Sequence, residues 1–166
     1  MKRTLSTDLV AVLRRRFRLD WRGIHGAGHW ARVRANGLRL APATGADITV
    51  VELFAVLHDV CREDDGLDPG HGARSAEFAL EVCDGLSAIG REQAQLLSLA
   101  CRHHSDGLTE ADVTVQTCWD ADRLDLGRVG ILPHPRYLCT AAARRAELID
   151  WAHARSMRAR HPGWRP

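Results

Sequence analysis

Histidine and aspartate residues recur along this chain in a pattern that could build a metal centre. They are His29, the adjacent pair His58 and Asp59, His71, the adjacent pair His103 and His104, and Asp122. No single loop carries them all, so several helices would have to bring them together, as happens in the core of a helix bundle. Imidazole nitrogen combined with carboxylate oxygen suits divalent ions such as Mn, Fe, Co and Zn. Such a site favours hydrolysis, because a bound ion lowers the pKa of a water molecule.

Each of these residues also has an ordinary structural explanation. His58 could cap carbonyl groups at the end of a helix while Asp59 faces water. The helix dipole favours histidines at a helix C-terminus, and this would account for His103 and His104. One acidic residue on a helix, such as Asp122, usually faces solvent. The functional interpretation therefore depends on all of these residues together.

Apolar periodicity and capping residues predict helices along the whole chain. The apolar segment ITVVELFAVLHDV, which Asp47 can cap, is expected to be a central buried helix. Gly37 is expected to end the preceding helix, with Pro42 and Gly45 in the loop that follows. The expected helices cover residues 6–17, about 24–36, 48–60, about 72–84, about 91–104, a segment capped by Thr109 that carries TCWDADRLDL, and about 140–158.

The bulk composition predicts one domain over residues 1–166, large enough to bury a core and a site. The formal net charge is only +2, which argues against a nucleic acid polymer or an anionic membrane as partner. The five cysteines form no Cys-x-x-Cys pair, which favours reduced, buried thiols in the cytosol. Thr7 and Asp8 interrupt the basic N-terminal segment, so it predicts neither a membrane span nor a cleaved leader. We expect a cytoplasmic protein, and its oligomeric state stays open.

The order of the histidines and aspartates resembles the H…HD…D pattern of the HD-domain superfamily of metal-dependent phosphohydrolases. The pattern is carried by His29, His58, Asp59 and Asp122, within the local sequences HWARV, FAVLHDVCRED and DADRLD. The resemblance covers roughly residues 20–130. It implies an all-α fold, an HD-domain helical bundle with a buried metal centre, and a C-terminal helix follows at about 140–158.

Additional histidines resemble those of superfamily members that hold two metals. His71, in the sequence HGA, is similar to their third histidine, and RHHSDGL is similar to their later HH-x-x-DG segment. The short loop between Asp59 and His71 leaves a single ion as the alternative, and the missing GYP motif argues against cyclic-di-GMP. The ions would be divalent, with Mn, Fe, Co, Ni, Zn and Mg as candidates. The resemblance implies that Asp59 bridges two ions, that His29, His58 and Asp122 hold the first, and that His71 and His103 hold the second, with His104 and Asp120 as alternatives.

Hydrolysis would need further residues that contact the substrate phosphate or move protons. Asp59 is expected to take part in catalysis, and Glu63 could orient a water molecule or leaving group, or merely face solvent. His25 could support the site or contact substrate, and His104 could donate to phosphate. Arginines near the proposed ligands are candidate phosphate contacts, although each could equally be a surface arginine: Arg32, Arg62, Arg74 and Arg123.

The leading hypothesis for function is a metal-dependent phosphohydrolase. It would cleave a phosphoester or phosphoanhydride of a small phosphorylated metabolite, for which a nucleotide is the leading substrate class. One alternative is a di-iron oxygenase on the same fold, which oxygen consumption by the iron-loaded protein would distinguish. A further alternative is a non-catalytic, metal-binding regulatory module, which would bind metal without turning over phosphoesters.

Overall fold

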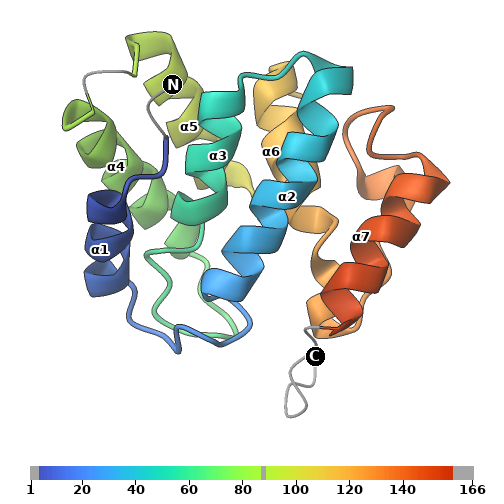
Figure 1. Ribbon diagram of the computed structural model, residues 1–166, viewed down its shortest axis with the longest axis horizontal. Helices are drawn as coiled ribbons and strands as arrows, with labels where there is room; N and C mark the ends of the chain where they lie inside the picture. The colour runs from blue at the N-terminus through green and yellow to red at the C-terminus, as the bar shows by residue number, and fades with distance from the viewer. Residues whose placement is uncertain (1–3, 87–88, 159–166) are drawn as a thin grey trace.

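The computed structural model describes residues 4–86 and 89–158, and this part of the chain contains α-helices, short 3-10 helices and no β-strand (Figure 1). The all-α fold class is therefore confirmed. The elements are α1 (Thr7–Arg16), α2 (Ala27–Thr44), α3 (Ile48–Leu57), α4 (His71–Asp84), α5 (Arg91–His103), α6 (Val113–Arg123), η1 (Leu126–Val129), η2 (Pro135–Tyr137) and α7 (Ala146–Arg158).

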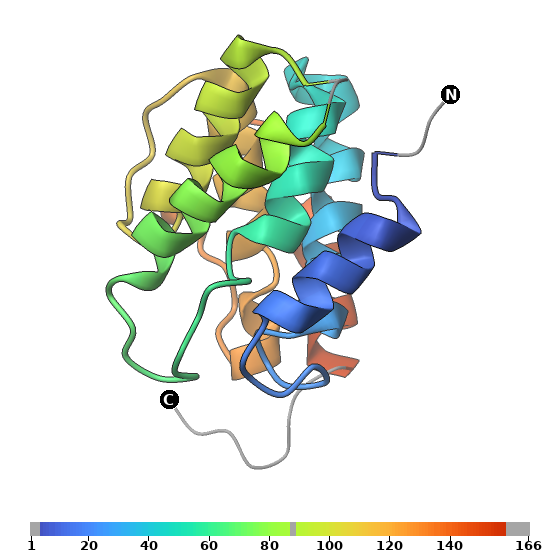
Figure 2. The same cartoon turned by 90° about the vertical axis from the view of Figure 1, so that its left-hand side faces the viewer.

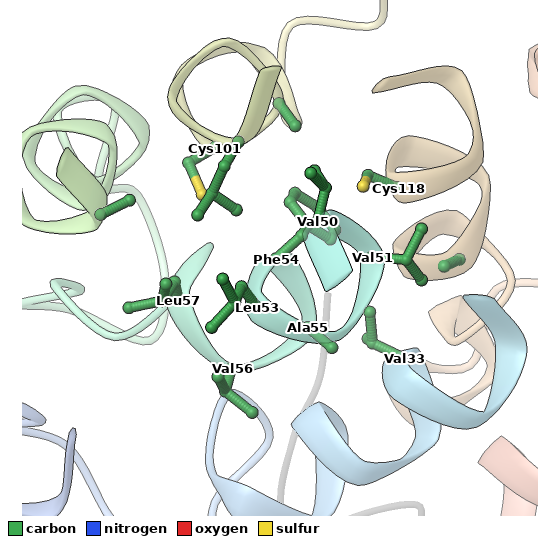
Figure 3. Packing of buried hydrophobic residues seen from close by; sticks show 14 of the residues in the cluster. Val33, Val50, Val51, Leu53, Phe54, Ala55, Val56, Leu57, Cys101 and Cys118 are labelled. Atoms are coloured by element: carbon green, nitrogen blue, oxygen red, sulfur yellow. The ribbon is translucent and has the colours of Figure 1, made fainter. Parts of the chain in front are cut away.

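Helix α3 is the centre of the bundle, as the sequence predicts. Asp47 caps its start, because one carboxylate oxygen accepts from the backbone N–H groups of Thr49 at 2.8 Å and Val50 at 3.1 Å. The helix contacts α2, α4, α5 and α6, so apolar side chains leave it in every direction. Figure 3 shows them meeting residues of the neighbouring helices, among them Cys101 and Cys118. All five cysteines of the chain are free and buried.

Helix α2 is longer than expected, because Gly37 does not end it. The helix continues through Pro42 to Thr44, and Gly45 ends it in the left-handed conformation with φ of 77°. A Cβ atom on Gly37 would lie 2.4 Å from Cγ1 of Val51, so this glycine permits close contact with α3. From the sequence alone, a glycine that ends a helix cannot be distinguished from one that permits close contact between two helices.

Other helix boundaries also differ from the expectation: α2 begins at Ala27 instead of about 24, and α3 ends at Leu57 instead of 60. Helix α6 begins at Val113 instead of near Thr109, because the carboxylate of Asp112 caps it by accepting from the N–H of Thr114 at 2.8 Å. Helix α7 begins at Ala146 instead of about 140. The turn before it is tied to α6, since Thr140 donates from its backbone and hydroxyl to a buried carboxylate of that helix. The C-terminal tail expected to fray, residues 159–166, lies outside the described residues.

The bundle brings several helix ends together. Helix α2 runs antiparallel to α3, so the start of α2 and the end of α3 lie at the same end of the molecule (Figure 1). Figure 2 shows the same end from the side, with the 58–70 segment and the 17–26 segment both lying there. A second, smaller apolar cluster joins α7 to α2 and to residues that follow α6, and α7 also contacts η1. Among the described residues, no helix combines the length and apolar character needed to cross a membrane.

Candidate metal centre

Four histidines and two aspartates converge at this end of the bundle. The histidines and Asp59 are at most 5% exposed, and Asp122 is half-buried. Their nitrogen and carboxylate oxygen atoms form three overlapping sets, and within each set the atoms lie no more than 4.8 Å apart: His29, His58 and Asp59; His58, His104 and Asp122; and Asp59, His71 and His104. The two pairs of histidines divide the cluster into two groups. The six residues are His29 from α2, His58 and Asp59 from the end of α3, His71 from the start of α4, His104 from the end of α5 and Asp122 from α6.

The first group contains His29, His58, one oxygen of Asp59 and one oxygen of Asp122. The two Nε2 atoms lie 3.0 Å apart. Oδ2 of Asp59 is 3.5 Å from each of them. Oδ1 of Asp122 is 3.3 Å from Nε2 of His29 and 3.7 Å from Nε2 of His58. These two nitrogens and two oxygens surround a volume that one ion could occupy.

The second group contains His71, His104 and the other oxygen of Asp59. The two Nε2 atoms lie 2.9 Å apart. Oδ1 of Asp59 is 3.5 Å from Nε2 of His71 and 3.4 Å from Nε2 of His104. Asp59 therefore presents one oxygen to each group, which is the geometry of a bridging carboxylate.

In the first group, the outer nitrogen of each histidine faces a hydrogen-bond acceptor. Nδ1 of His29 donates to Oδ2 of Asp125 at 2.7 Å, and Nδ1 of His58 donates to the carbonyl oxygen of Phe54 at 3.1 Å. A neutral imidazole carries one N–H, so these bonds leave an unshared electron pair on each Nε2. Two such pairs face one another within hydrogen-bond distance, and this is unfavourable unless a proton or a cation lies between them.

The second group repeats this arrangement with backbone acceptors. Nδ1 of His71 donates to the carbonyl oxygen of Asp68, and Nδ1 of His104 donates to the carbonyl oxygen of Cys101 at 2.8 Å. Both Nε2 atoms therefore again direct electron pairs into the same space. Metal-binding histidines commonly donate their other N–H in this way, which fixes the ring and its tautomer. The donor set in both groups fits divalent ions that accept nitrogen and oxygen ligands.

The pKa values within each pair are displaced in opposite directions. Burial alone would lower the pKa of His29, but the carboxylates of Asp122, Asp125 and Asp59 raise it to about 9. Burial lowers the pKa of His58, its partner. Each ring pair can therefore share one proton when no metal is bound, and a divalent ion would replace that proton. Burial alone would raise the pKa of Asp59, but the charge of His58 and hydrogen bonds from the surrounding histidines hold it well below its usual range.

Local structure explains how these side chains reach the same point. Helix α3 ends at Leu57. His58 is its C-cap and keeps helical backbone angles, and Asp59 lies in the turn that follows, so both side chains are at the helix end that faces the cluster. The start of α4 lies against the end of α5, since a Cβ atom on Gly72 would be 2.5 Å from the carbonyl oxygen of Arg102. This close approach places His71 beside the residue that follows α5.

The structure brings His104 into the cluster and leaves His103 outside it. His103 is half-exposed, and its Nδ1 lies 2.7 Å from Oδ2 of Asp106. Successive residues at a helix end point about 100° apart, so only one of the two can face the centre. Asp120 also lies outside the cluster. It is fully buried and accepts hydrogen bonds from the backbone N–H groups of Cys139 at 2.6 Å and Thr140 at 2.8 Å, which is a structural role.

Of the four arginines that the sequence suggests as phosphate contacts, Arg62 lies nearest the cluster. Its Nε is 3.8 Å from Oδ1 of Asp59, and this nitrogen is buried without a hydrogen-bond partner. Arg32 is held by Asp125, and Arg74 by Asp68. An unpartnered guanidinium nitrogen beside the cluster is suited to an anionic ligand.

The remaining candidates take other positions. Arg123 is buried away from the cluster and donates to the carbonyl oxygens of Tyr137 at 2.8 Å and Leu108 at 2.6 Å. Glu63 is exposed and pairs with Arg18 at 3.1 Å. His25 is buried near the site, where its Nδ1 lies 2.9 Å from Asp65 and burial lowers its pKa to about 4.

Asp125, the residue that holds His29, is not among the candidates that the sequence pattern indicates. Asp125 is 1% exposed and also receives two hydrogen bonds from Arg32, at 2.7 and 3.0 Å. A signal was present, because Asp125 follows Asp122 by three residues, a spacing that places two side chains on one helical face.

Comparison with known proteins gives one informative likeness. No protein-family model matches the chain, and no curated protein does. A crystal structure of a predicted HD superfamily hydrolase from an uncultured Thermotogales bacterium superposes on it with a TM-score of 0.68 and 24% sequence identity. The match covers 91% of this chain and 86% of that one. The chain therefore has the fold of the HD superfamily.

Proposed function

We propose that this protein is a metal-dependent phosphohydrolase with two metal positions bridged by Asp59. The single observation that carries the proposal is the division of the Asp59 carboxylate between two pairs of histidines. Two bound divalent ions would lower the pKa of a water molecule and offset the charge of the phosphoryl oxygens. The fold shared with a predicted HD superfamily hydrolase supports a hydrolytic reaction.

The charge around the cluster supports a phosphorylated substrate. Asp59 and Asp122 are ionised and can therefore hold divalent ions. Burial would raise the pKa of each, but the neighbouring histidines lower it. Nε of Arg62 makes no hydrogen bond, so it can donate to a phosphate oxygen without giving one up. The half-buried Asp122 is the carboxylate of the cluster nearest to solvent. We propose that it orients the attacking water.

A small metabolite, with nucleotides as the leading class, is the substrate we propose. A formal net charge of +2 offers little attraction to a nucleic acid polymer. The substrate phosphate would lie between the cluster and Arg62, and the rest of the molecule would extend into neighbouring space.

The test is to purify the protein without chelator, measure metal per chain by elemental mass spectrometry, and assay phosphate release from nucleotides with added Mn. We expect two ions and turnover, and Arg62→Gln should raise KM at unchanged metal content. Arg18→Gln, which removes an exposed arginine elsewhere, is the matched control. Metal without phosphate release from any phosphoester would contradict the proposal. Oxygen consumption by the iron-loaded protein would favour an oxygenase instead.

A further inference from the structure

A cavity of about 350 Å³ adjoins the metal centre and shares His29 as part of its wall. It is formed by the turn before α2, the first residues of α2 and the buried side chain of Arg128 in η1. No carboxylate lines the cavity among the described residues. The lining residues that matter for its chemistry are Trp21, Arg22, Gly28, His29, Arg32 and Arg128.

The positive charge beside this cavity is only partly balanced. Arg128 is 6% exposed, and its guanidinium donates to the carbonyl oxygens of Ile24 at 2.9 Å and Asp125 at 3.2 Å. Its nearest carboxylate oxygen belongs to Asp125, at 4.0 Å. That same carboxylate already accepts from Arg32 and His29. The carboxylate of Asp125 is thus the shared counter-ion of Arg32 and Arg128. A buried charge that has no counter-ion of its own is unfavourable.

The start of α2 adds to this field. Gly26 is the N-cap and supplies no side-chain hydrogen bond, so the first turn of this 18-residue helix has no side-chain cap. Gly28 and His29 belong to that turn and line the cavity. Free N–H groups at a helix start attract negative charge. Arg22 is exposed at the rim and contributes a further positive group.

We propose that this cavity binds a second phosphate group of the substrate, one that is not cleaved at the metal centre. The proposal rests on the proposed phosphohydrolase function and narrows its substrate class to small metabolites that carry at least two phosphates. Such a phosphate would add a second counter-ion for Arg128, which shares the carboxylate of Asp125 with Arg32. A volume of about 350 Å³ exceeds what one phosphate fills, so part of the remaining molecule fits there too.

Gly28 offers a way to change the charge of the cavity with little change in structure. It is exposed, and a Cβ atom added there would meet only Nη1 of Arg32, at 3.5 Å, an ordinary contact. Gly28→Glu would place a carboxylate in the cavity, and Gly28→Gln would add a side chain of the same size without charge. A carboxylate in the first turn of a helix is itself favourable, so Gly28→Glu should fold.

The first measurement is calorimetric titration of inorganic phosphate into metal-free wild type, Gly28→Gln and Gly28→Glu. We expect Gly28→Gln to stay within about threefold of wild type and Gly28→Glu to bind about tenfold more weakly than Gly28→Gln. His58 does not line the cavity, so His58→Ala, which damages the metal centre, should keep its phosphate affinity. Equal affinities for the two Gly28 variants, or no binding by wild type, would overturn the proposal.

The second measurement compares KM for a nucleoside monophosphate and the matching diphosphate, using metal-loaded protein of equal metal content. Gly28→Glu should raise KM for the diphosphate about tenfold relative to Gly28→Gln and leave the monophosphate within about twofold. Parallel changes for both substrates would contradict a second phosphate position. If the wild type hydrolyses neither compound, the proposed function fails, and the phosphate titration still decides whether the cavity binds an anion.

Discussion

The two histidine pairs of the cluster are held in place by different parts of the chain. His29 and His58, the first pair, lie on α2 and at the end of the central helix α3, and both are fully buried. His71 and His104, the second pair, lie at the start of α4 and just beyond α5, and each is 5% exposed. The first pair is therefore built into the centre of the bundle, and the second depends on where two peripheral helices begin and end.

The outer hydrogen bonds and the charges of the two pairs also differ. In the first pair, a buried carboxylate, Asp125, holds one ring, and Asp122 adds a second carboxylate oxygen to the space between the rings. In the second pair both rings donate to backbone carbonyls. One carboxylate, Asp59, lies 3.5 Å or less from both rings of the second pair, and an oxygen of Asp122 comes within 4.8 Å of His104. Because more negative charge surrounds the first position, we expect it to bind a divalent ion more tightly.

The largest effect is expected from Asp59→Asn, since this residue belongs to both positions. An amide keeps the shape of the side chain but offers neither position a charged oxygen, so we expect both ions to be lost. Phosphate release should fall by at least about three orders of magnitude, as when a metal site that activates water is removed. Elemental mass spectrometry with a parallel activity assay would measure this, and circular dichroism would check folding. Retention of both ions would show that Asp59 does not bridge.

A smaller effect, confined to one position, should separate the two adjacent histidines after α5. His104→Ala should reduce the metal content from two ions to one, because its Nε2 faces the second position. His103→Ala, the matched control, should leave both ions in place, since that ring pairs with Asp106. The measurement is metal per chain after gel filtration. Loss of an ion from His103→Ala alone would reverse this assignment.

The adjacent histidines also show what sequence can and cannot determine. The order of His29, His58, Asp59 and Asp122 and the helical periodicity suffice to predict the fold class, and the structure brings these four residues together. Which histidine after α5 faces the centre depends on where that helix ends and how it packs, and residues one position apart point about 100° apart.

Tertiary contacts that the sequence does not display explain the other differences. Gly37 has the signature of a helix stop, yet its function is contact with Val51 of a separate helix. Asp120 and Asp122 are both plausible ligands in the sequence DAD. Which of the two faces the cluster depends on the 138–140 segment, because backbone N–H groups of that segment donate to Asp120. Asp125 could have been found from its spacing to Asp122, but its importance follows from its contact with His29.

Asp125→Asn should weaken the first position selectively. An amide can still accept from Nδ1 of His29, but it lacks the charge that strengthens this ring as a ligand, and it loses ionic pairing with Arg32. Changes in such outer partners commonly reduce metal affinity by about 10- to 100-fold. Competition with a fluorescent chelator would measure both affinities. Asp106→Asn removes a carboxylate bonded to a histidine outside the cluster and should change neither. A loss confined to the second position would contradict the expectation.

The smallest effect should come from Arg74→Gln, which acts on the second position through the backbone. Arg74 donates to both carboxylate oxygens of Asp68, at 2.8 and 2.6 Å, and to the carbonyl oxygen of Cys61 at 3.1 Å. These bonds fix the residue whose carbonyl orients His71. Arg74 is half-exposed, so the pair contributes little, and we expect the second affinity to fall by about two- to fivefold.

For this variant, the first affinity should stay unchanged, because no contact of Arg74 reaches the first pair. Arg18→Gln removes an exposed ion pair with Glu63, a residue that also lies 3.9 Å from Arg74, and should leave both affinities unchanged. Chelator competition at low and high salt adds a further criterion, because an effect through a partly exposed ion pair should shrink as salt screens it. Equal loss of affinity at both positions in Arg74→Gln would mean that the two histidine pairs are not held independently. The first position would then not differ from the second in how the bundle holds it.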